Sequence, residues 1–153
     1  MRYAQLTEAA LLEALHWRAS LVWEEYRADL LAHPDAIASP EDAIRDQRVR
    51  VAIGEGRILG FSVVVPTTAD AHELDGLFVD PEFMGRGIGR SLVTDAAAIA
   101  RASGVSRLEV TANPRAVGFY EKVGFAAQGS ASTRFGPGVR MNMDLDQSAS
   151  ADR

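Results

Sequence analysis

The chain has 153 residues, the length of one ordinary domain, and its 47% hydrophobic and 24% charged residues exclude a disordered or collagen-like protein. Sixteen Lys+Arg against 21 Asp+Glu give a net charge of −5, which argues against nucleic acids and anionic membranes as partners. The sequence contains no cysteine, so disulfides, thiolate metal sites and a cysteine nucleophile are excluded. With no apolar leader and no membrane-length apolar run, this composition predicts a cytoplasmic protein.

The N-terminal part of the chain is expected to form a short strand followed by helices. Residues 1–7 alternate loosely, as a strand does. From Thr7 onward, apolar residues recur at helical spacing until His33-Pro34, where the proline should end the helix. Ser39-Pro40 then resembles an N-cap followed by proline at the first helical position, which predicts a short helix over 40–47.

Strands dominate the remaining pattern, with two helices between them. β-branched runs predict a hairpin over 50–53 and 58–65, with Pro66 closing its second strand. Three elements should follow: a strand over 73–79, a helix over 88–102 capped by Gly104, and a strand over 107–111. The last elements are a helix from Asn113-Pro114 to Gly124, and strands from Phe125 and over 139–145 separated by Gly136-Pro137-Gly138. This order predicts an α/β (or α+β) fold with a mixed sheet, in one domain over 1–146 with a polar tail over 147–153.

A glycine-rich loop, Met84-Gly85-Arg86-Gly87-Ile88-Gly89-Arg90, lies between the predicted strand 73–79 and the helix 88–102. Alternating glycines let a ligand approach the backbone, and the helix N-terminus offers unpaired N–H groups to a phosphate. A dinucleotide fingerprint would need glycine where Arg90 stands, and a P-loop would end in Gly-Lys-Ser/Thr. Both are therefore excluded, which leaves a different phosphate site or a plain glycine-rich turn.

Residues 77–92, which include this loop, resemble the acetyl-CoA motif of the GNAT superfamily of N-acetyltransferases, whose pattern is Gln/Arg-x-x-Gly-x-Gly/Ala. Residues 113–125 resemble the family's next motif, Asn-x-x-Ala-x-x-Phe-Tyr-x-x-x-Gly-Phe. Together with the hairpin, the resemblance covers roughly 48–145. Met84 departs from the pattern, because the family usually has Gln or Arg there, and this puts the affinity for the pyrophosphate in question.

The resemblance implies a central sheet, flanked by helices, in which strands 73–79 and 107–111 splay apart to admit the pantetheine arm of acetyl-CoA. Leu77-Phe78-Val79 would pair with pantetheine, and the Leu77 N–H would polarise the thioester carbonyl. The loop would bind the pyrophosphate through Gly85, Arg86, Gly87, Ile88, Gly89 and Arg90. Asn113 corresponds to a cofactor-side residue in the family, although an N-cap role before Pro114 explains it equally well.

The resemblance also implies residues for the two proton transfers. Tyr120 stands at the position of the family's general acid, and a phenol with a pKa near 10 can protonate a leaving thiolate; core packing is its alternative role. Glu73 and Asp75 are both candidates for the base, since they share a strand face with Leu77. The alternative is that both are solvated acids. The N-terminal helices, with His16, Trp17, Trp23, Glu24 and Tyr26, would shape the acceptor pocket or pack in the core.

The function predicted from the resemblance is direct acetyl transfer from acetyl-CoA to a primary amine of a small molecule or peptide, with no metal and no acyl-enzyme. The alternative is an acyl-CoA-binding regulatory or sensor domain without turnover. A nucleotide-binding module is disfavoured by the loop spacing. A homodimer is left open, because dimers are common in the family.

Overall fold

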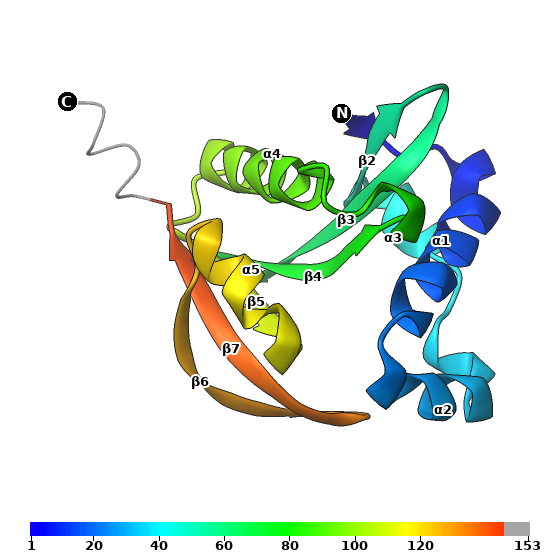
Figure 1. Cartoon of the computed structure of the whole chain (residues 1–153). Helices are drawn as coiled ribbons and strands as arrows, with labels where there is room; N and C mark the ends of the chain where they lie inside the picture. The colour runs from blue at the N-terminus through cyan, green and yellow to red at the C-terminus, as the bar shows by residue number, and fades with distance from the viewer. Residues whose placement is uncertain (146–153) are drawn as a thin grey trace. The chain divides into compact units, whose positions relative to one another are not determined.

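The computed structural model describes residues 1–145, without the side chains of residues 24–26, so the predicted tail over 147–153 lies outside the described residues. The fold is a mixed α/β fold with the strand order β1-β2-β3-β4-β5-β7-β6 (Figure 1), which confirms the predicted fold class. Its elements are β1 (Arg2–Tyr3), η1 (Leu6–Glu8), α1 (Ala9–Leu21), α2 (Glu24–Ala32), η2 (Pro34–Ala36), α3 (Glu41–Arg45), β2 (Val49–Gly54), β3 (Arg57–Thr68), β4 (Ala71–Val79), η3 (Pro81–Phe83), α4 (Ile88–Ala102), β5 (Arg107–Ala112), η4 (Pro114–Ala116), α5 (Val117–Lys122), β6 (Ala126–Thr133) and β7 (Gly136–Asp144).

The described chain forms two compact units, and strands β3 and β4 contribute to both. The first comprises Met1–Val63 and Gly76–Leu92, and the second comprises Val64–Asp75 and the chain from Val93 onward. Among the described residues no helix is long and apolar enough to cross a membrane.

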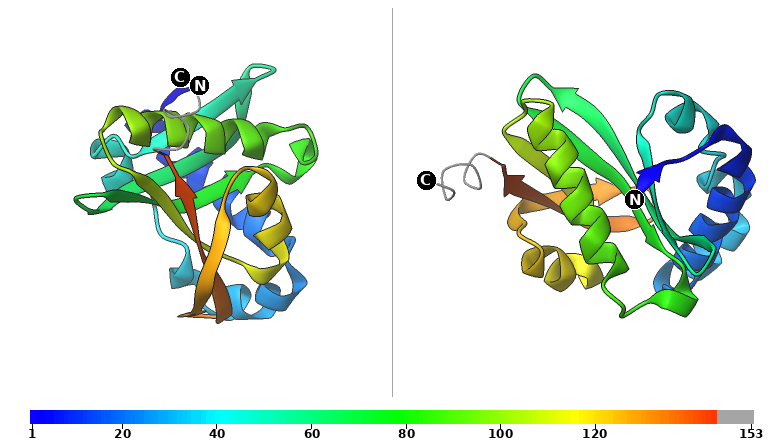
Figure 2. Two further views of the ribbon diagram at one scale, coloured as in Figure 1. Left: turned by 90° about the vertical axis from the view of Figure 1, so that its left-hand side faces the viewer. Right: turned by 90° about the horizontal axis from the view of Figure 1, so that it is seen from above.

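The core of the first unit joins α1 and α3 to the β2–β3 hairpin, and Figure 2 shows α1 lying beside that hairpin. Leu12 and Leu15 are one turn apart on α1 and are buried against Val51 and Phe61. The sequence predicted one helix up to His33, and this was wrong. Helix α1 ends at Leu21, and α2 begins at Glu24. Between them Trp23 has an extended backbone, which interrupts the helix and serves as the N-cap position of α2.

The β2–β3 hairpin turns at Glu55 and Gly56, whose φ angles of 53° and 73° suit the tight turn of a two-residue hairpin. The expectation that Pro66 closes the second strand was wrong, because β3 continues to Thr68. The pairing of β3 with β2 ends at Val63. Pro66 lies beyond that point, where β3 makes no hydrogen bonds to β2. The missing N–H of Pro66 therefore costs no hydrogen bond to β2, and the strand can continue through the proline.

The sheet of the second unit has an apolar face and a polar face. Strand β5 alternates strictly between buried and half-buried residues: Leu108 and Val110 are fully buried, whereas Glu109 and Thr111 lie on the other face. Strand β5 pairs in parallel with β4 over Ala71–Glu73 and antiparallel with β7 along its whole length. The polar face therefore carries charged side chains from three neighbouring strands.

Two predicted boundaries in the second unit needed correction. The predicted helix from Asn113 divides into η4 and the six-residue α5. The predicted break at Gly136-Pro137-Gly138 lies inside β7, and the turn falls at residues 134–135. Gly138 serves a different purpose there, because a Cβ on it would lie 2.9 Å from the Thr111 side chain. Glycine thus permits close approach of β5 and β7 rather than a turn.

Candidate active site

Asp80 anchors the loop that leaves β4 in the first unit. Its side chain is almost completely buried and accepts hydrogen bonds from Arg18 Nη2 at 2.9 Å, Arg57 Nη2 at 3.0 Å and the Glu82 N–H at 3.1 Å. Burial alone would raise the pKa of Asp80, but the Glu82 amide and the two guanidinium groups hold the pKa below its usual value. The loop is therefore attached through one carboxylate to both α1 and β3.

The glycine-rich loop lies between β4 and α4, where the sequence predicted it. Gly85 and Gly87 have φ angles of +79° and +81°, a region open mainly to glycine. The Gly87 carbonyl accepts the Ser91 N–H at 3.0 Å, so α4 begins directly after the loop and leaves its first N–H groups without helical partners. A Cβ built on Gly85 or Gly87 would meet no protein atom within 4 Å. The space that an anion needs next to this backbone is present.

Aromatic contacts order the side chains around this loop. Phe83 is buried, and the guanidinium groups of Arg57 and Arg86 lie 4.9 Å and 5.1 Å from its ring centroid, within the range of cation–π attraction. Met84, the position at which the chain departs from the family pattern, is 54% exposed. The Met84 side chain therefore plays no part in the core of this unit.

His16 forms a contact that sequence reasoning did not predict. Its ring centroid lies 3.8 Å from that of Phe78 on β4 and 6.4 Å from that of Phe61 on β3. Burial among these rings lowers the pKa of His16 to about 4, so the imidazole is neutral at pH 7. Trp17 and Trp23 are half-buried, whereas the side chains of Glu24 and Tyr26, also predicted for this region, lie outside the described residues.

The second unit contains Tyr120, the predicted acid. Its ring is 9% exposed and packs edge-to-face against Phe119 and Phe125, with centroids 5.1 Å and 5.4 Å away. Burial raises the pKa of Tyr120 to about 12. Within residues 1–145 no hydrogen bond joins the Tyr120 hydroxyl to another described residue, and this hydroxyl is not among the fully buried oxygens that lack a partner. The ring of Tyr120 thus serves as a packing element of this unit.

Asn113 fulfils the capping alternative. Its Oδ1 accepts the Arg115 N–H at 2.9 Å at the start of η4, as an N-cap side chain does. The role on the cofactor side, which the resemblance implies, stays a prediction.

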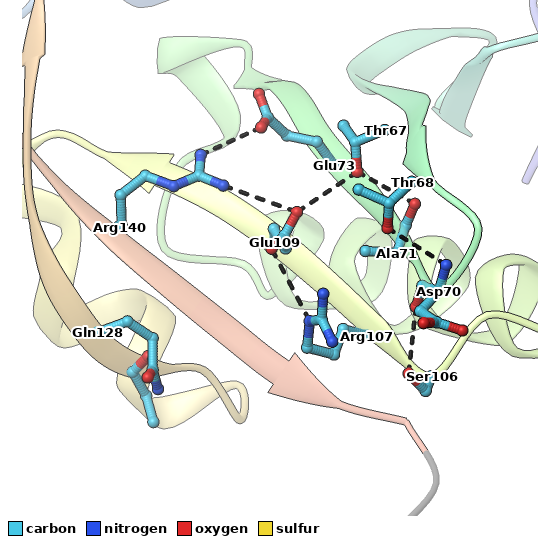
Figure 3. A network of polar contacts seen from close by, with 11 residues as sticks. Thr67, Thr68, Asp70, Ala71, Glu73, Ser106, Arg107, Glu109, Gln128 and Arg140 are labelled. Carbon is cyan, nitrogen blue, oxygen red and sulfur yellow. Dashed lines mark hydrogen bonds and ion pairs between the residues drawn. The ribbon is translucent and has the colours of Figure 1, made fainter.

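The two candidate bases have different environments, although both lie on β4 in the second unit. Asp75 is exposed. Glu73 is half-buried, and its Oε1 accepts a hydrogen bond from Arg140 Nη1 at 3.1 Å (Figure 3). Arg140 Nη2 also lies 3.7 Å from Glu109 Oε1. Sequence reasoning missed this pairing, because Arg140 is 67 positions from Glu73 and no local motif includes it.

The predicted site residues fall into two groups. The first unit contains the segment 77–79 and the glycine-rich loop, predicted to hold the cofactor. The second contains the predicted proton-transfer residues Glu73, Asp75 and Tyr120, together with Asn113.

The sequence matches the acetyltransferase (GNAT) family over residues 10–125. The chain belongs to this family. A peptidyl-lysine N-acetyltransferase of Escherichia coli, YjaB, is 34% identical over 110 residues, which are 69% of this chain and 63% of that protein. Its namesake in Salmonella typhimurium is 43% identical over 58 residues, 38% of this chain and 39% of that protein. The matched part thus spans less than two thirds of the length of either relative.

The GNAT fold is also found by structural comparison. The PaiA N-acetyltransferase of Thermoplasma acidophilum, solved with coenzyme A, superposes with a TM-score of 0.72 at 18% identity, covering 94% of this chain and 96% of that one. At this level of identity the likeness establishes the fold. The fold class expected from the resemblance is thereby confirmed, whereas the roles of individual residues remain predictions.

Proposed function

We propose that the chain is an acetyl-CoA-dependent N-acetyltransferase that moves an acetyl group directly to a primary amine of a small molecule or peptide. The observation that carries this proposal is the loop before α4, where two glycines in the left-handed region border open space at a helix N-terminus. The partial positive charge of a helix N-terminus favours a phosphate there. A family member with this loop has the means to bind the pyrophosphate of acetyl-CoA through Gly85–Arg90.

Acetyl-CoA supplies the activated thioester, and the chain supplies orientation and proton transfer. Leu77–Val79 would hold the pantetheine arm through backbone hydrogen bonds, with the Leu77 N–H directed at the carbonyl oxygen as it gains negative charge. An aliphatic amine with a pKa around 10.4 arrives protonated and must lose a proton before it attacks. Glu73 is our candidate for accepting this proton, directly or through water, with Asp75 as the competitor. Tyr120 would donate to the leaving sulfur.

A panel of amines tests the proposal. Acetyl-CoA is incubated with the protein and each amine, and release of free CoA is followed together with the mass of the acetylated product. Lysine-containing peptides belong in the panel, because two relatives are named peptidyl-lysine N-acetyltransferases. Amine-dependent CoA release supports an enzyme. Saturable binding of acetyl-CoA with no turnover on any amine would instead favour the sensor alternative.

The base is tested by a matched pair of variants. Glu73→Gln and Asp75→Asn both remove a proton acceptor while keeping the shape of the side chain. If Glu73 is the base, Glu73→Gln should lower kcat/KM by 10²–10⁴-fold and the loss should shrink at high pH, where the amine is already neutral. Asp75→Asn should change the rate far less. A loss confined to Asp75→Asn would move the role two residues along β4.

The location and assembly of the protein are also proposals. The proposed cytoplasmic location is supported by the absence of cysteine from the sequence. The proposed homodimer rests only on the fact that dimers are common in the family. Light scattering coupled to size-exclusion chromatography would measure the molar mass in solution and so test it.

A further inference from the structure

Arg140 bridges two carboxylates on the polar face of the second unit (Figure 3). On the sheet, Arg140 of β7 is paired with Thr111 of β5, and Glu109 of β5 is paired with Glu73 of β4. Arg140 Nη1 donates to Glu73 Oε1 and to Thr111 Oγ1, and Nη2 lies 3.7 Å from Glu109 Oε1. One guanidinium thus contacts the strand of the candidate base and the strand beside it.

This arrangement is more constrained than an ordinary surface ion pair. The side chains of Arg140, Glu73 and Glu109 are 31%, 25% and 17% exposed, so each is largely shielded from water. Glu109 is held in addition by the Thr67 hydroxyl at 3.4 Å and by Arg107 Nε at 3.8 Å. Because Glu109 and Thr111 restrict the guanidinium, its hydrogen bond to Glu73 has a defined direction.

The contact has a consequence for the proton acceptor. Like charges directly opposite each other on paired strands repel, so without a cation between them the Glu73 and Glu109 carboxylates would turn apart. Arg140 removes that repulsion and occupies Glu73 Oε1. Within residues 1–145 no side chain or backbone group bonds Glu73 Oε2. That oxygen is left to accept a proton.

We infer that Arg140 is a positioning residue for the base: its guanidinium fixes the orientation of the Glu73 carboxylate through Oε1, with Oε2 available to the ammonium proton or to a bridging water. The inference rests on the proposed function, in which Glu73 accepts a proton from the amine. Arg140 itself transfers no proton, since a guanidinium keeps its charge throughout the working pH range. It acts through Glu73.

The test is a double-mutant cycle with a matched control. Turnover is measured for the wild type, Arg140→Gln, Glu73→Gln and the double variant, with Arg140→Lys as the conservative change. Arg107→Gln is the control, because Arg107 contacts Glu109 on the same face but does not contact Glu73. Arg140→Gln should lower kcat by about tenfold, a part of the 10²–10⁴-fold that a general base contributes. The KM for acetyl-CoA should stay within about twofold.

Three further results are expected if Arg140 acts through Glu73. Arg140→Lys should recover part of the rate, Arg107→Gln should stay within about twofold of the wild type, and Arg140→Gln should add nothing in the Glu73→Gln background. An equal loss in both backgrounds would overturn the inference, because the two residues would then act independently. If Glu73→Gln alone is silent, the base assignment fails and the inference fails with it.

A crystal structure of Arg140→Gln separates this inference from the proposed enzymatic function, because it needs no turnover. A Glu73 carboxylate that adopts a new orientation in the variant supports the positioning role. A carboxylate that keeps its wild-type orientation overturns that role, even where the wild type is an active acetyltransferase. If the wild type releases no CoA with any amine, the proposed function is wrong, whatever the crystal structure of Arg140→Gln shows.

Discussion

Replacing Gly87 with alanine should remove the stabilisation that acetyl-CoA gives to the protein. At a concentration 100 times its Kd, a ligand that binds only the native state stabilises it by about 2.7 kcal/mol. For a domain of this size each kcal/mol raises Tm by roughly 2–4 °C, so acetyl-CoA should raise the wild-type Tm by about 5–11 °C. A methyl group at Gly87 would occupy the open space beside the backbone, which the pyrophosphate is expected to need.

The variant also carries a cost that has nothing to do with the ligand. Alanine in the left-handed region costs about 1 kcal/mol, or roughly 2–4 °C of Tm. Gly56 provides the matched control, because its φ of +73° is close to the +81° of Gly87 and its Cβ would also meet nothing within 4 Å. By differential scanning fluorimetry, both variants should melt lower without ligand, and only Gly56→Ala should keep the full shift with acetyl-CoA. An equal shift in both would refute the assignment of the loop to the phosphates.

Two further predictions concern the aromatic contacts. Tyr120→Phe keeps the ring contacts with Phe119 and Phe125, so Tm should change little while kcat falls about 10²–10³-fold, the loss typical of removing one hydrogen-bond donor to a developing negative charge. Turnover within about twofold of the wild type, equal to that of the exposed-site control Tyr3→Phe, would make Tyr120 a packing residue only. Burial lowers the pKa of His16 to about 4 from about 6.5 in an unfolded chain. The buried neutral imidazole therefore contributes fully to the free energy of unfolding above pH 6.5, and this contribution is lost as the pH falls towards 4, because the unfolded chain binds the proton more tightly. Between pH 7 and pH 4.5 the free energy of unfolding of His16→Phe, measured by urea unfolding, should therefore fall by about 2 kcal/mol less than that of the wild type. If the free energy of unfolding of both proteins depends on pH in the same way, His16 is not a buried neutral imidazole.

The elements with local signals at both ends could be predicted from the sequence. Helix α4 was predicted over 88–102 and has these bounds, since glycines precede it and Gly104, with a φ of +90°, ends it. The break between α1 and α2 could not be predicted in this way, because neither proline nor glycine stands between Leu21 and Trp23. The apolar periodicity runs through the break, so no local pattern marks its position.

The polar contacts around the candidate site were beyond sequence reasoning for a related reason. Asp80 directly follows the predicted strand 73–79, but nothing local indicates its partners Arg18 and Arg57, which are 62 and 23 positions away. The register of β4, β5 and β7 brings Arg140 to Glu73 in the same way. Family motifs identify residues that contact the ligand. The residues that hold them in place are defined by strand pairing, which no short pattern contains.

Burial gives Tyr120 two properties that bear on its proposed role in opposite ways. With a pKa of about 12, it is a weaker acid than the sequence suggested, and full transfer of its proton to a thiolate with a pKa near 8.5 is uphill by roughly 5 kcal/mol. The same burial keeps most of the phenol protonated at about pH 10.4, where half of the amine is already neutral. A donor that stays protonated can hydrogen-bond the sulfur as negative charge develops there, without completing the transfer, and the CoA thiolate can take its proton from water after release. The packing of Phe119 and Phe125 around the ring therefore favours a hydrogen-bond donor over a proton source.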